Sequence, residues 1–298
     1  MIDRASSSAQ SPLAGAYSLE VTIRDIPALA DVASRAPSGS LVSITNLPHE
    51  SDEARIAAAR DVRRLSFEPM PHIAARRVAS SSELETFLFR AVAEASVECC
   101  LIISGDTSNT GGPYHDSASL IASDILERSG LKVIGVAGHP DGHPVMSEAQ
   151  CWSALETKCR SIAERGMTPL IVTQFTFDAD VVLSWLKALR ARGLEYPVRI
   201  GVPGPADAAT LLRFAARCGV SASASVLAKY GVSAGKLLRP AGPDVFVDRL
   251  AAGLGAEHGA VRLQFYPFGG ISRTIDWIAR YAASSTPQPD DQVRSTIR

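Results

Sequence analysis

The sequence predicts a single-domain (β/α)8 TIM barrel, an α/β fold, and three observations lead to this fold class. The chain has 298 residues, 46% of them hydrophobic, and one α/β barrel commonly reaches about this length. Apolar runs of strand length alternate with helical patterns, as is typical of a parallel sheet whose strands are joined by helices. There are roughly eight such β-then-α units, which favours a closed barrel over an open doubly wound sheet.

The candidate strands are rich in apolar or β-branched residues and are bounded by Gly, Pro or Asp. In chain order they are 17–23, 40–45, 72–78, 99–106, 131–139, 170–175, 197–204 and 261–268. Among the intervening helices, 178–193 has an apolar stripe at the i, i+3, i+4, i+7 spacing of a helix that packs on a sheet. The stripe consists of Val182, Trp185, Leu186 and Leu189. The segments 1–16 and 284–298 have no apolar period, so we expect a barrel over 17–283 between two flexible tails.

Composition narrows the class of partner. The formal net charge of -1 gives no electrostatic reason to expect nucleic acid or an anionic membrane surface. The chain has no run of about 18 apolar residues and its start has no apolar signal region, so we expect neither a membrane span nor a signal peptide. The five cysteines form no C-x-x-C pair, which indicates reduced thiols in the cytoplasm. A small molecule is the expected partner, and a homo-oligomer stays open.

Polar residues gather where the candidate strands end. Because the carboxyl ends of barrel strands meet at one mouth, we expect these side chains to converge there. Gln174 is the most informative, since an amide among aromatic residues must find a hydrogen-bond partner or cost stability. The strand-end residues are Glu20, Thr45, Asn46, His72, Gly105, Asp106, His139, His143, Gln174 and Tyr266.

Two carboxyl groups are candidates for chemistry. Glu20 shares one strand face with Ser18 and Thr22, opposite the apolar residues of the run. If that face meets the barrel axis, desolvation would raise the pKa of Glu20 toward a value useful for proton donation; a surface or ion-paired glutamate is the alternative. Asp106 follows Gly105, which permits close approach of a ligand, but a turn or helix-capping aspartate is an equal reading.

The loops exclude several kinds of site. In GHPDGHP, 138–144, the prolines argue against a helix that would place both histidines on one metal, so we expect polar cofactor contacts or structural hydrogen bonds and no metal. The glycines at 253–259 have the wrong spacing for a dinucleotide fingerprint and precede a strand. No G-x-S-x-G elbow is present, which disfavours an α/β-hydrolase.

Six separated motifs, in the same order along the chain, resemble the methylenetetrahydrofolate reductase family, a (β/α)8 barrel that binds FAD. The resemblance extends from about Tyr17 to Tyr281. The motifs are VSIT at 42–45, PMPH at 69–72, SGD at 104–106, GHPDGHP at 138–144, VTQFTFD at 172–178 and QFYPF at 264–268.

The resemblance implies a role for each matching residue. Glu20 matches the general acid, and Asp106 matches the aspartate near the flavin and the pterin. Gln174 matches the glutamine that hydrogen-bonds the folate, and Phe214 matches a phenylalanine that packs on the substrate. The positions that match FAD contacts are Thr45, His72, Asp106, Ser117, His139 and His143.

The implied activity is reduction of 5,10-methylenetetrahydrofolate to 5-methyltetrahydrofolate. A proton from Glu20 would open the five-membered ring to a cation, and Asp106, the second catalytic residue, would favour that cation electrostatically. Hydride would come from reduced FAD, and NADH or NADPH would regenerate the flavin. The chain departs from the family at two places. It reads EVTIR at 20–24 where the family has E-F-F-P-P, and 153–166 lacks the N-L-K-x-K-V-D-A-G signature that contacts FAD, leaving Lys158 and Arg160 as candidate replacements.

Two alternatives stay open. One is the same reaction by direct hydride transfer from NADH, without a tightly held flavin. The other is a folate-binding methyl-transfer or accessory protein with no redox step.

Overall fold

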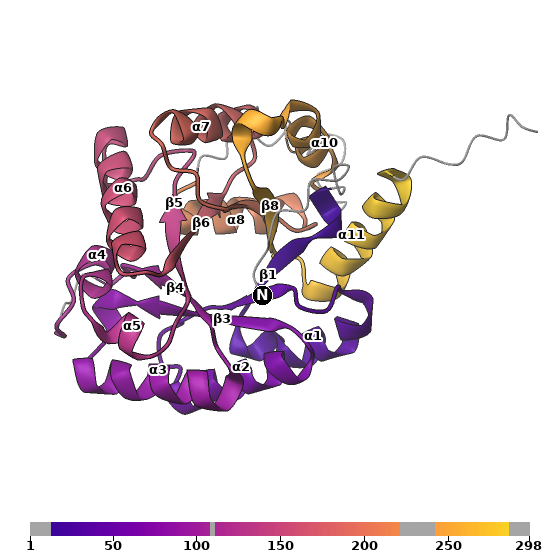
Figure 1. Cartoon of the computed structure of the whole chain (residues 1–298). Coiled ribbons are helices and arrows are strands. Elements are labelled where there is room, and N and C mark those ends of the chain that lie inside the picture. The colour runs from indigo at the N-terminus through magenta and orange to yellow at the C-terminus, as the bar shows by residue number, and fades with distance from the viewer. Residues whose placement is uncertain (1–12, 108–110, 221–229, 231–241, 286–298) are drawn as a thin grey trace, which may run out of the picture.

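The eight predicted strands form a closed parallel barrel in the computed structural model, which describes residues 13–107, 111–220, 230 and 242–285. Each strand pairs with its neighbours in sequence, and β1 closes the ring by pairing with β8 (Figure 1). The fold class is therefore confirmed. The strands are β1 Tyr17–Val21, β2 Leu41–Ile44, β3 Glu68–Ala74, β4 Cys99–Ile103, β5 Val133–Gly138, β6 Thr168–Phe175, β7 Val198–Pro203 and β8 Val261–Tyr266. The two predicted tails lie largely outside the described residues.

Both boundaries of the third strand were predicted wrongly, whereas the other predicted strands differ from the observed ones by at most three residues at an end. The third strand begins at Glu68 and ends at Ala74, whereas the sequence suggested 72–78. Pro69 and Pro71 lack the N–H that a sheet interior needs. They nevertheless pair with β2, and pairing with β4 begins only at His72, after both prolines. The expected second half of the strand is instead a 3-10 turn, Ala75–Arg77, which turns two arginines into the loop above the barrel.

The helices cover the outside of the barrel because each has one apolar face. In α7, the predicted stripe at Val182, Trp185, Leu186 and Leu189 is buried, as expected. Several helix starts are capped by short polar side chains, such as Ser51 before α2 and Asp207 before α8. The helices are α1 Ile26–Val32, α2 Asp52–Arg64, α3 Ser81–Ala95, α4 Ser117–Ile121, α5 Ile125–Arg128, α6 Glu148–Glu164, α7 Ala179–Ala191, α8 Ala208–Cys218, α10 Asp244–Gly253 and α11 Ile271–Ser285.

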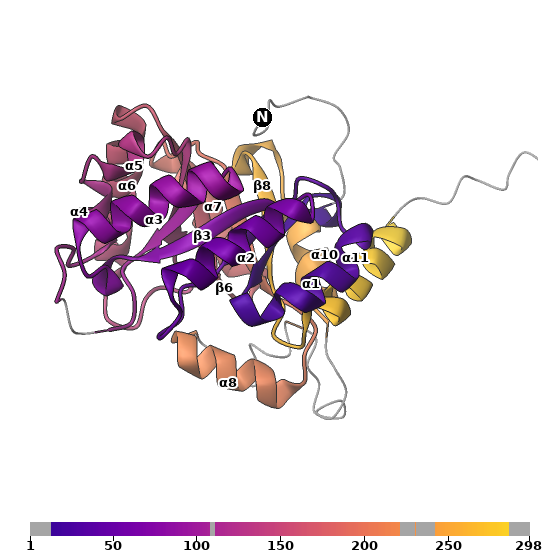
Figure 2. The same ribbon diagram turned by 90° about the horizontal axis from the view of Figure 1, so that it is seen from below.

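Helix α8 differs from the others in position. Figure 2 shows it apart from the ring of helices, at one end of the barrel. That end is the carboxyl end of the strands, because Gly219, just after α8, lies against Pro144 in the loop that follows β5. The last turn of α8 therefore contributes to the mouth where function is expected.

The inside of the barrel is apolar on one side and polar on the other. Leu41, Met70, Leu101 and Leu170 belong to an apolar cluster from strands β2 to β6, separate from the larger core between strands and helices. On the opposite side, the buried Gln264 hydrogen-bonds Ser18 and donates to Ser43 Oγ at 3.2 Å. Glu20 and His72 come two residues after Ser18 and Met70 on the same strand faces, so they lie nearer the mouth.

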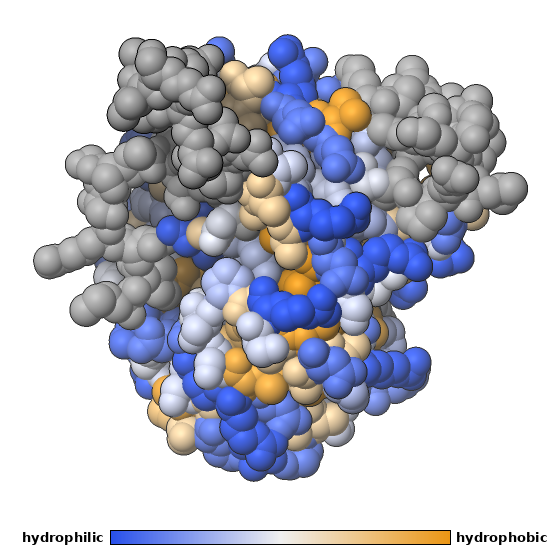
Figure 3. All heavy atoms as spheres, turned by 90° about the vertical axis from the view of Figure 1, so that its right-hand side faces the viewer, coloured by the Kyte–Doolittle hydropathy of each residue, from blue (hydrophilic) through white to orange (hydrophobic). Residues whose placement is uncertain are grey.

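The outer surface is mixed in character. On the face shown in Figure 3, hydrophobic and hydrophilic side chains are interspersed. Across the described residues, no helix combines the length and the apolar character needed to cross a membrane.

Candidate active site

The centre of the mouth holds two facing side chains, Glu20 from β1 and His72 from β3. Their nearest atoms, Glu20 Oε2 and His72 Nε2, are 3.8 Å apart. Burial raises the pKa of Glu20 to about 8. Burial, and then the charge of Arg55, lowers the pKa of His72 to about 3. At neutral pH the site therefore presents a protonated carboxyl group beside a neutral imidazole.

Two other groups close to Glu20 are also neutral. The hydroxyl of Tyr266, at the end of β8, donates to Thr173 O at 3.0 Å. Burial, and then the charge of Glu20, raises the pKa of Tyr266 well above its ordinary value. The thiol of Cys218, from α8, has its pKa raised by the same two causes in the same order. A carboxylate at position 20 would have no cationic neighbour among these groups.

The predicted residue Thr45 lies beside this centre. It directly follows β2, and its backbone N–H donates to Val21 O at 2.9 Å. Its Oγ1 atom is buried and has no hydrogen-bond partner among the described residues, and the same is true of His72 Nε2. Buried polar atoms usually have partners, so both atoms are candidates to meet a ligand.

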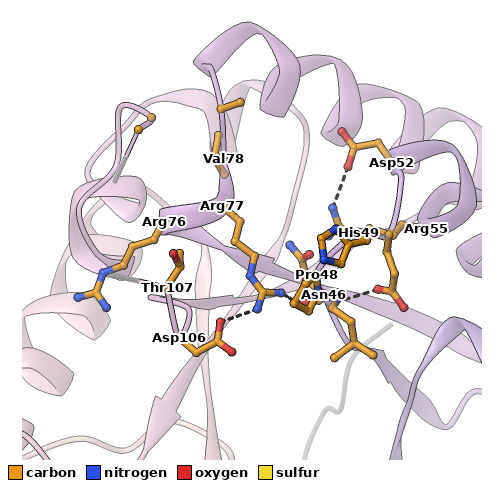
Figure 4. A pocket seen from close by; sticks show the side chains of 15 residues that line it. Asn46, Pro48, His49, Asp52, Arg55, Arg76, Arg77, Val78, Asp106 and Thr107 are labelled. Atoms are coloured by element: carbon orange, nitrogen blue, oxygen red, sulfur yellow. Dashed lines mark hydrogen bonds and ion pairs between the residues drawn. The ribbon is translucent and has the colours of Figure 1, made fainter. Parts of the chain in front are cut away.

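Asp106 lies in a larger cavity of about 780 Å³, lined by the loops that follow β2, β3 and β4 (Figure 4). Its carboxylate pairs with the Arg77 guanidinium at 2.5 Å, and Arg77 also hydrogen-bonds Asn46 O. Arg77 therefore ties the three loops together. Desolvation acts to raise the pKa of Asp106, but the hydrogen bond and charge of Arg77 lower it below its ordinary value.

A second, smaller cavity of about 90 Å³ contains Gln174, His139 and His143, with Cys218 at its wall. The Oε1 atom of Gln174 accepts a hydrogen bond from Phe175 N at 3.0 Å, so the backbone supplies one partner for the amide. The two histidine rings meet edge to face at 4.9 Å. Burial lowers the pKa of both, that of His139 to about 4. Both rings are therefore neutral at pH 7.

The remaining predicted residues lie at the edges of the mouth. Ser117, at the start of α4, donates its backbone N–H to Ser104 Oγ at 3.1 Å, which links it to the SGD segment. Phe214 on α8 stacks on Phe268 with the ring centres 4.1 Å apart. Phe268 in turn meets Phe175 edge to face at 4.9 Å, so Phe214 extends an aromatic cluster from the core to the mouth.

The predicted residues thus share one end of the barrel but not one cavity. Glu20 meets His72, and Gln174 groups with the two loop histidines, whereas Asp106 faces Arg77 in the larger cavity. Among the described residues, no hydrogen bond or ion pair joins Glu20, Asp106 and Gln174 to one another.

Sequence reasoning missed three residues of the site. Arg77 was placed within a strand, and a correct strand end at Ala74 would have put it among the mouth residues. Arg55 belongs to α2 and carries no local signal of its contact with His72. Cys218 ends a helix, and its approach to the mouth depends on the position of α8.

Comparison with known proteins identifies the family of the chain. The family model described as methylenetetrahydrofolate reductase matches residues 25–251. "Methylenetetrahydrofolate reductase 2" of Saccharomyces cerevisiae is 32% identical over 80 residues, which is 27% of this chain and only 13% of the yeast protein.

Two solved structures are similar to this chain at low sequence identity, and only the first, with a TM-score above 0.5, supports the fold and nothing beyond it. The dihydropteroate synthase of Thermus thermophilus superposes with a TM-score of 0.51 at 12% identity, covering 90% of this chain and 93% of that one. For the Yersinia pestis dihydropteroate synthase the TM-score is 0.48 at 9% identity, with 90% and 92% covered. The family match, in contrast, spans well over half of the sequence and includes His72, Asp106 and Gln174. The chain belongs to the methylenetetrahydrofolate reductase family.

Proposed function

We propose that this protein reduces 5,10-methylenetetrahydrofolate to 5-methyltetrahydrofolate, with Glu20 as the general acid. The observation that carries the proposal is the state of Glu20 in a member of this family. A carboxyl group whose pKa is about 8 keeps its proton at neutral pH, and this one lies at the barrel mouth. Ordinary glutamates, which are ionised at pH 7, have no proton to give.

Proton donation by Glu20 would open the five-membered ring of the substrate. The proton passes to the ring nitrogen that becomes the leaving group, and the substrate becomes a 5-iminium cation while Glu20 becomes a carboxylate. The side chain of Glu20 is 20% exposed, so it can reach a ligand in the mouth and is still largely shielded from water. Exclusion of water strengthens the attraction between the new carboxylate and the new cation.

Gln174 and Phe214 would hold the folate. A pterin edge presents donors and acceptors like those of an amide, and a carboxamide can pair with both. The Gln174 amide is positioned for this by its bond to Phe175 N. Phe214 is stacked on Phe268, which leaves an aromatic wall against which a flat ring can pack.

Asp106 would have a smaller electrostatic role than the family resemblance implies. Its carboxylate is paired with Arg77, so the field it exerts on a substrate cation is largely offset. We therefore assign Asp106 to positioning the loops and the ligands of the larger cavity. The ring-opened cation would depend mainly on Glu20.

The residues present fit an FAD cofactor. Thr45 Oγ1 is a buried hydroxyl oxygen without a partner in the described parts of the chain. Lys158, on α6, is buried, and no ion pair joins it to an acidic residue among those described; its charge helps to lower the pKa of His139. Thr45, Lys158 and His139 would hold the cofactor together with His72, Ser117 and His143. When bound, the flavin supplies the hydride, and NADH or NADPH regenerates it.

A second candidate is the same reaction by direct hydride transfer from NADH. It is favoured by α6, which lacks the family signature for FAD and has only Lys158 as a buried cation. An absorbance spectrum of the purified protein separates the two candidates. The visible absorption bands of bound flavin support the first, whereas a colourless protein that stays active after dialysis supports the second.

The proposal itself is tested by turnover of methylenetetrahydrofolate with NADH or NADPH, followed anaerobically. Glu20→Gln should abolish folate reduction and leave any flavin reduction by NAD(P)H intact. Glu98→Gln is the matched control, because Glu98 pairs with Lys132 at the opposite end of the barrel. Folate binding without NAD(P)H oxidation by the wild type, with and without added flavin, would instead identify a folate-binding accessory protein.

A further inference from the structure

The centre of the mouth contains an interaction that the proposed function does not explain. His72 Nε2 is buried, has no hydrogen-bond partner among the described residues, and faces the carboxyl group of Glu20 at 3.8 Å. We propose that His72 is the positioning residue for Glu20, a neutral imidazole whose Nε2–H donates to the carboxylate that remains after Glu20 has given up its proton.

The distance suits a partner that acts after proton transfer. At 3.8 Å the two atoms are not hydrogen-bonded, and the separation must shorten by about 0.8 Å to make a good bond. Glu20 accepts no hydrogen bond from any other described side chain or backbone group. The lack of a donor costs little free energy while the carboxyl group is neutral, but a buried carboxylate in the same place would require a hydrogen-bond donor.

The surroundings of His72 keep its ring neutral. The buried guanidinium of Arg55 donates to His72 O, pairs with Asp52 at 3.0 Å and lies 4.2 Å from the centre of the Phe87 ring. This fixed cation, after burial itself, lowers the pKa of His72. If His72 were an imidazolium, its positive charge would favour ionisation of Glu20 before the substrate binds, and Glu20 could no longer act as an acid. By disfavouring protonation of His72, Arg55 therefore helps Glu20 to keep its proton.

The two titratable groups whose pKa the charge of Glu20 raises do not fill this role. Tyr266, from β8, already donates its only hydroxyl proton to Thr173 O. Cys218, from α8, is a weak donor with a raised pKa. Of these three groups, His72, whose Nε2 atom lies 3.8 Å from the carboxyl group, is therefore the available donor.

The pair is tested directly by carbon-13 NMR of protein labelled at the glutamate carboxyl carbon. The Glu20 signal is assigned by its loss in Glu20→Gln, and its titration midpoint is compared between variants. His72→Leu removes the donor, so the midpoint should rise by about one pH unit, because the carboxylate loses its partner. His72→Gln, whose amide N–H can reach, should stay close to the wild type. His115→Leu, which removes an exposed imidazole, is the control and should change nothing.

A midpoint that stays the same or falls in His72→Leu would overturn the proposal. If His72→Leu does not fold, His72→Asn is used in its place. The asparagine amide is too short to reach Glu20, so the titration midpoint of Glu20 should rise as expected for His72→Leu. These titrations need no substrate, so they remain decisive even if the protein proves not to reduce folate.

The rate measurement rests on the proposed function. Loss of the donor should lower kcat by about tenfold and move the alkaline limb of its pH profile upward, with rescue by His72→Gln. An unchanged profile in an enzyme that turns over folate would contradict the role of His72, whereas absence of turnover in the wild type would count only against the proposed function.

Discussion

Replacing Glu20 with glutamine should stabilise the protein at alkaline pH. Glutamine has nearly the same shape and cannot ionise. Below pH 4.5 the carboxyl group is protonated in both the folded and the unfolded chain, so Glu20 has no pH-dependent effect on stability. Between pH 4.5 and about 8 the unfolded chain ionises and the folded chain does not. Stability attributable to Glu20 is therefore lost as pH rises through this interval, and the loss is complete above pH 8.

The magnitude follows from the two pKa values. An interval from 4.5 to about 8, at about 1.36 kcal/mol per pH unit, gives about 5 kcal/mol. This is an upper bound, because the 20% exposure of the side chain lets water solvate part of the charge. The free energy of unfolding of Glu20→Gln, relative to the wild type, should thus increase by several kcal/mol between pH 5 and pH 9.

Urea unfolding of both proteins at several pH values measures this difference, and subtraction removes the contribution of groups that they share. Glu98→Gln is a control in which the stability should change in the opposite direction. The hydrogen bond to Lys132 lowers the pKa of Glu98, so this substitution should slightly decrease the free energy of unfolding above pH 5. If wild type and Glu20→Gln keep a constant difference from pH 5 to pH 9, the carboxyl group is not desolvated as described.

Three further predictions concern the rest of the mouth. Gln174→Leu should raise the folate KM or lower kcat by the equivalent of about 1–3 kcal/mol, which steady-state kinetics would detect and normal kinetics would contradict. Arg77→Leu should raise the pKa of Asp106, since the hydrogen bond of Arg77 lowers it, and Arg77→Lys should preserve part of the effect; NMR titration of Asp106 measures both, and an unmoved midpoint would refute the pairing. His72 should destabilise the protein by up to about 1.4 kcal/mol for each pH unit below 6.5, because its pKa of about 3 means that the unfolded chain binds a proton which the folded chain excludes. Urea unfolding of the wild type and His72→Gln between pH 4 and pH 7 checks the slope, which should be shallower in the variant.

The fold was accessible from sequence because each βα unit shows its own pattern. Alternation along 17–23 also predicted the face of Glu20 correctly, since Tyr17, Leu19 and Val21 pack into the helix-facing core. The third strand was misplaced because Pro69 and Pro71 argue against a strand in sequence, although the strand begins at Glu68, before both of them. That error removed Arg77 from the predicted mouth, where it neutralises Asp106.

The contacts within the site depend on geometry that no local pattern encodes. Glu20 and His72 are not on neighbouring strands, so their approach depends on the curvature of the closed barrel across β2. Cys218 reaches the same region only because α8 lies across the mouth. The sequence identified which strand ends were polar, and it could not divide them between two cavities.

The distribution of charge suggests why a neutral centre is useful here. Arg55 pairs with Asp52 and Arg77 with Asp106, so two of the fixed cations around the mouth each have a carboxylate partner. Three titratable groups face Glu20 or are affected by its charge, namely His72, Tyr266 and Cys218, and all three are neutral at pH 7. Under the proposed function, proton transfer from Glu20 creates a carboxylate and a substrate cation in the same step. Because these three groups carry no charge, the new carboxylate and the new cation face each other without a competing charge from them, and the transfer leaves the net charge of the pair unchanged.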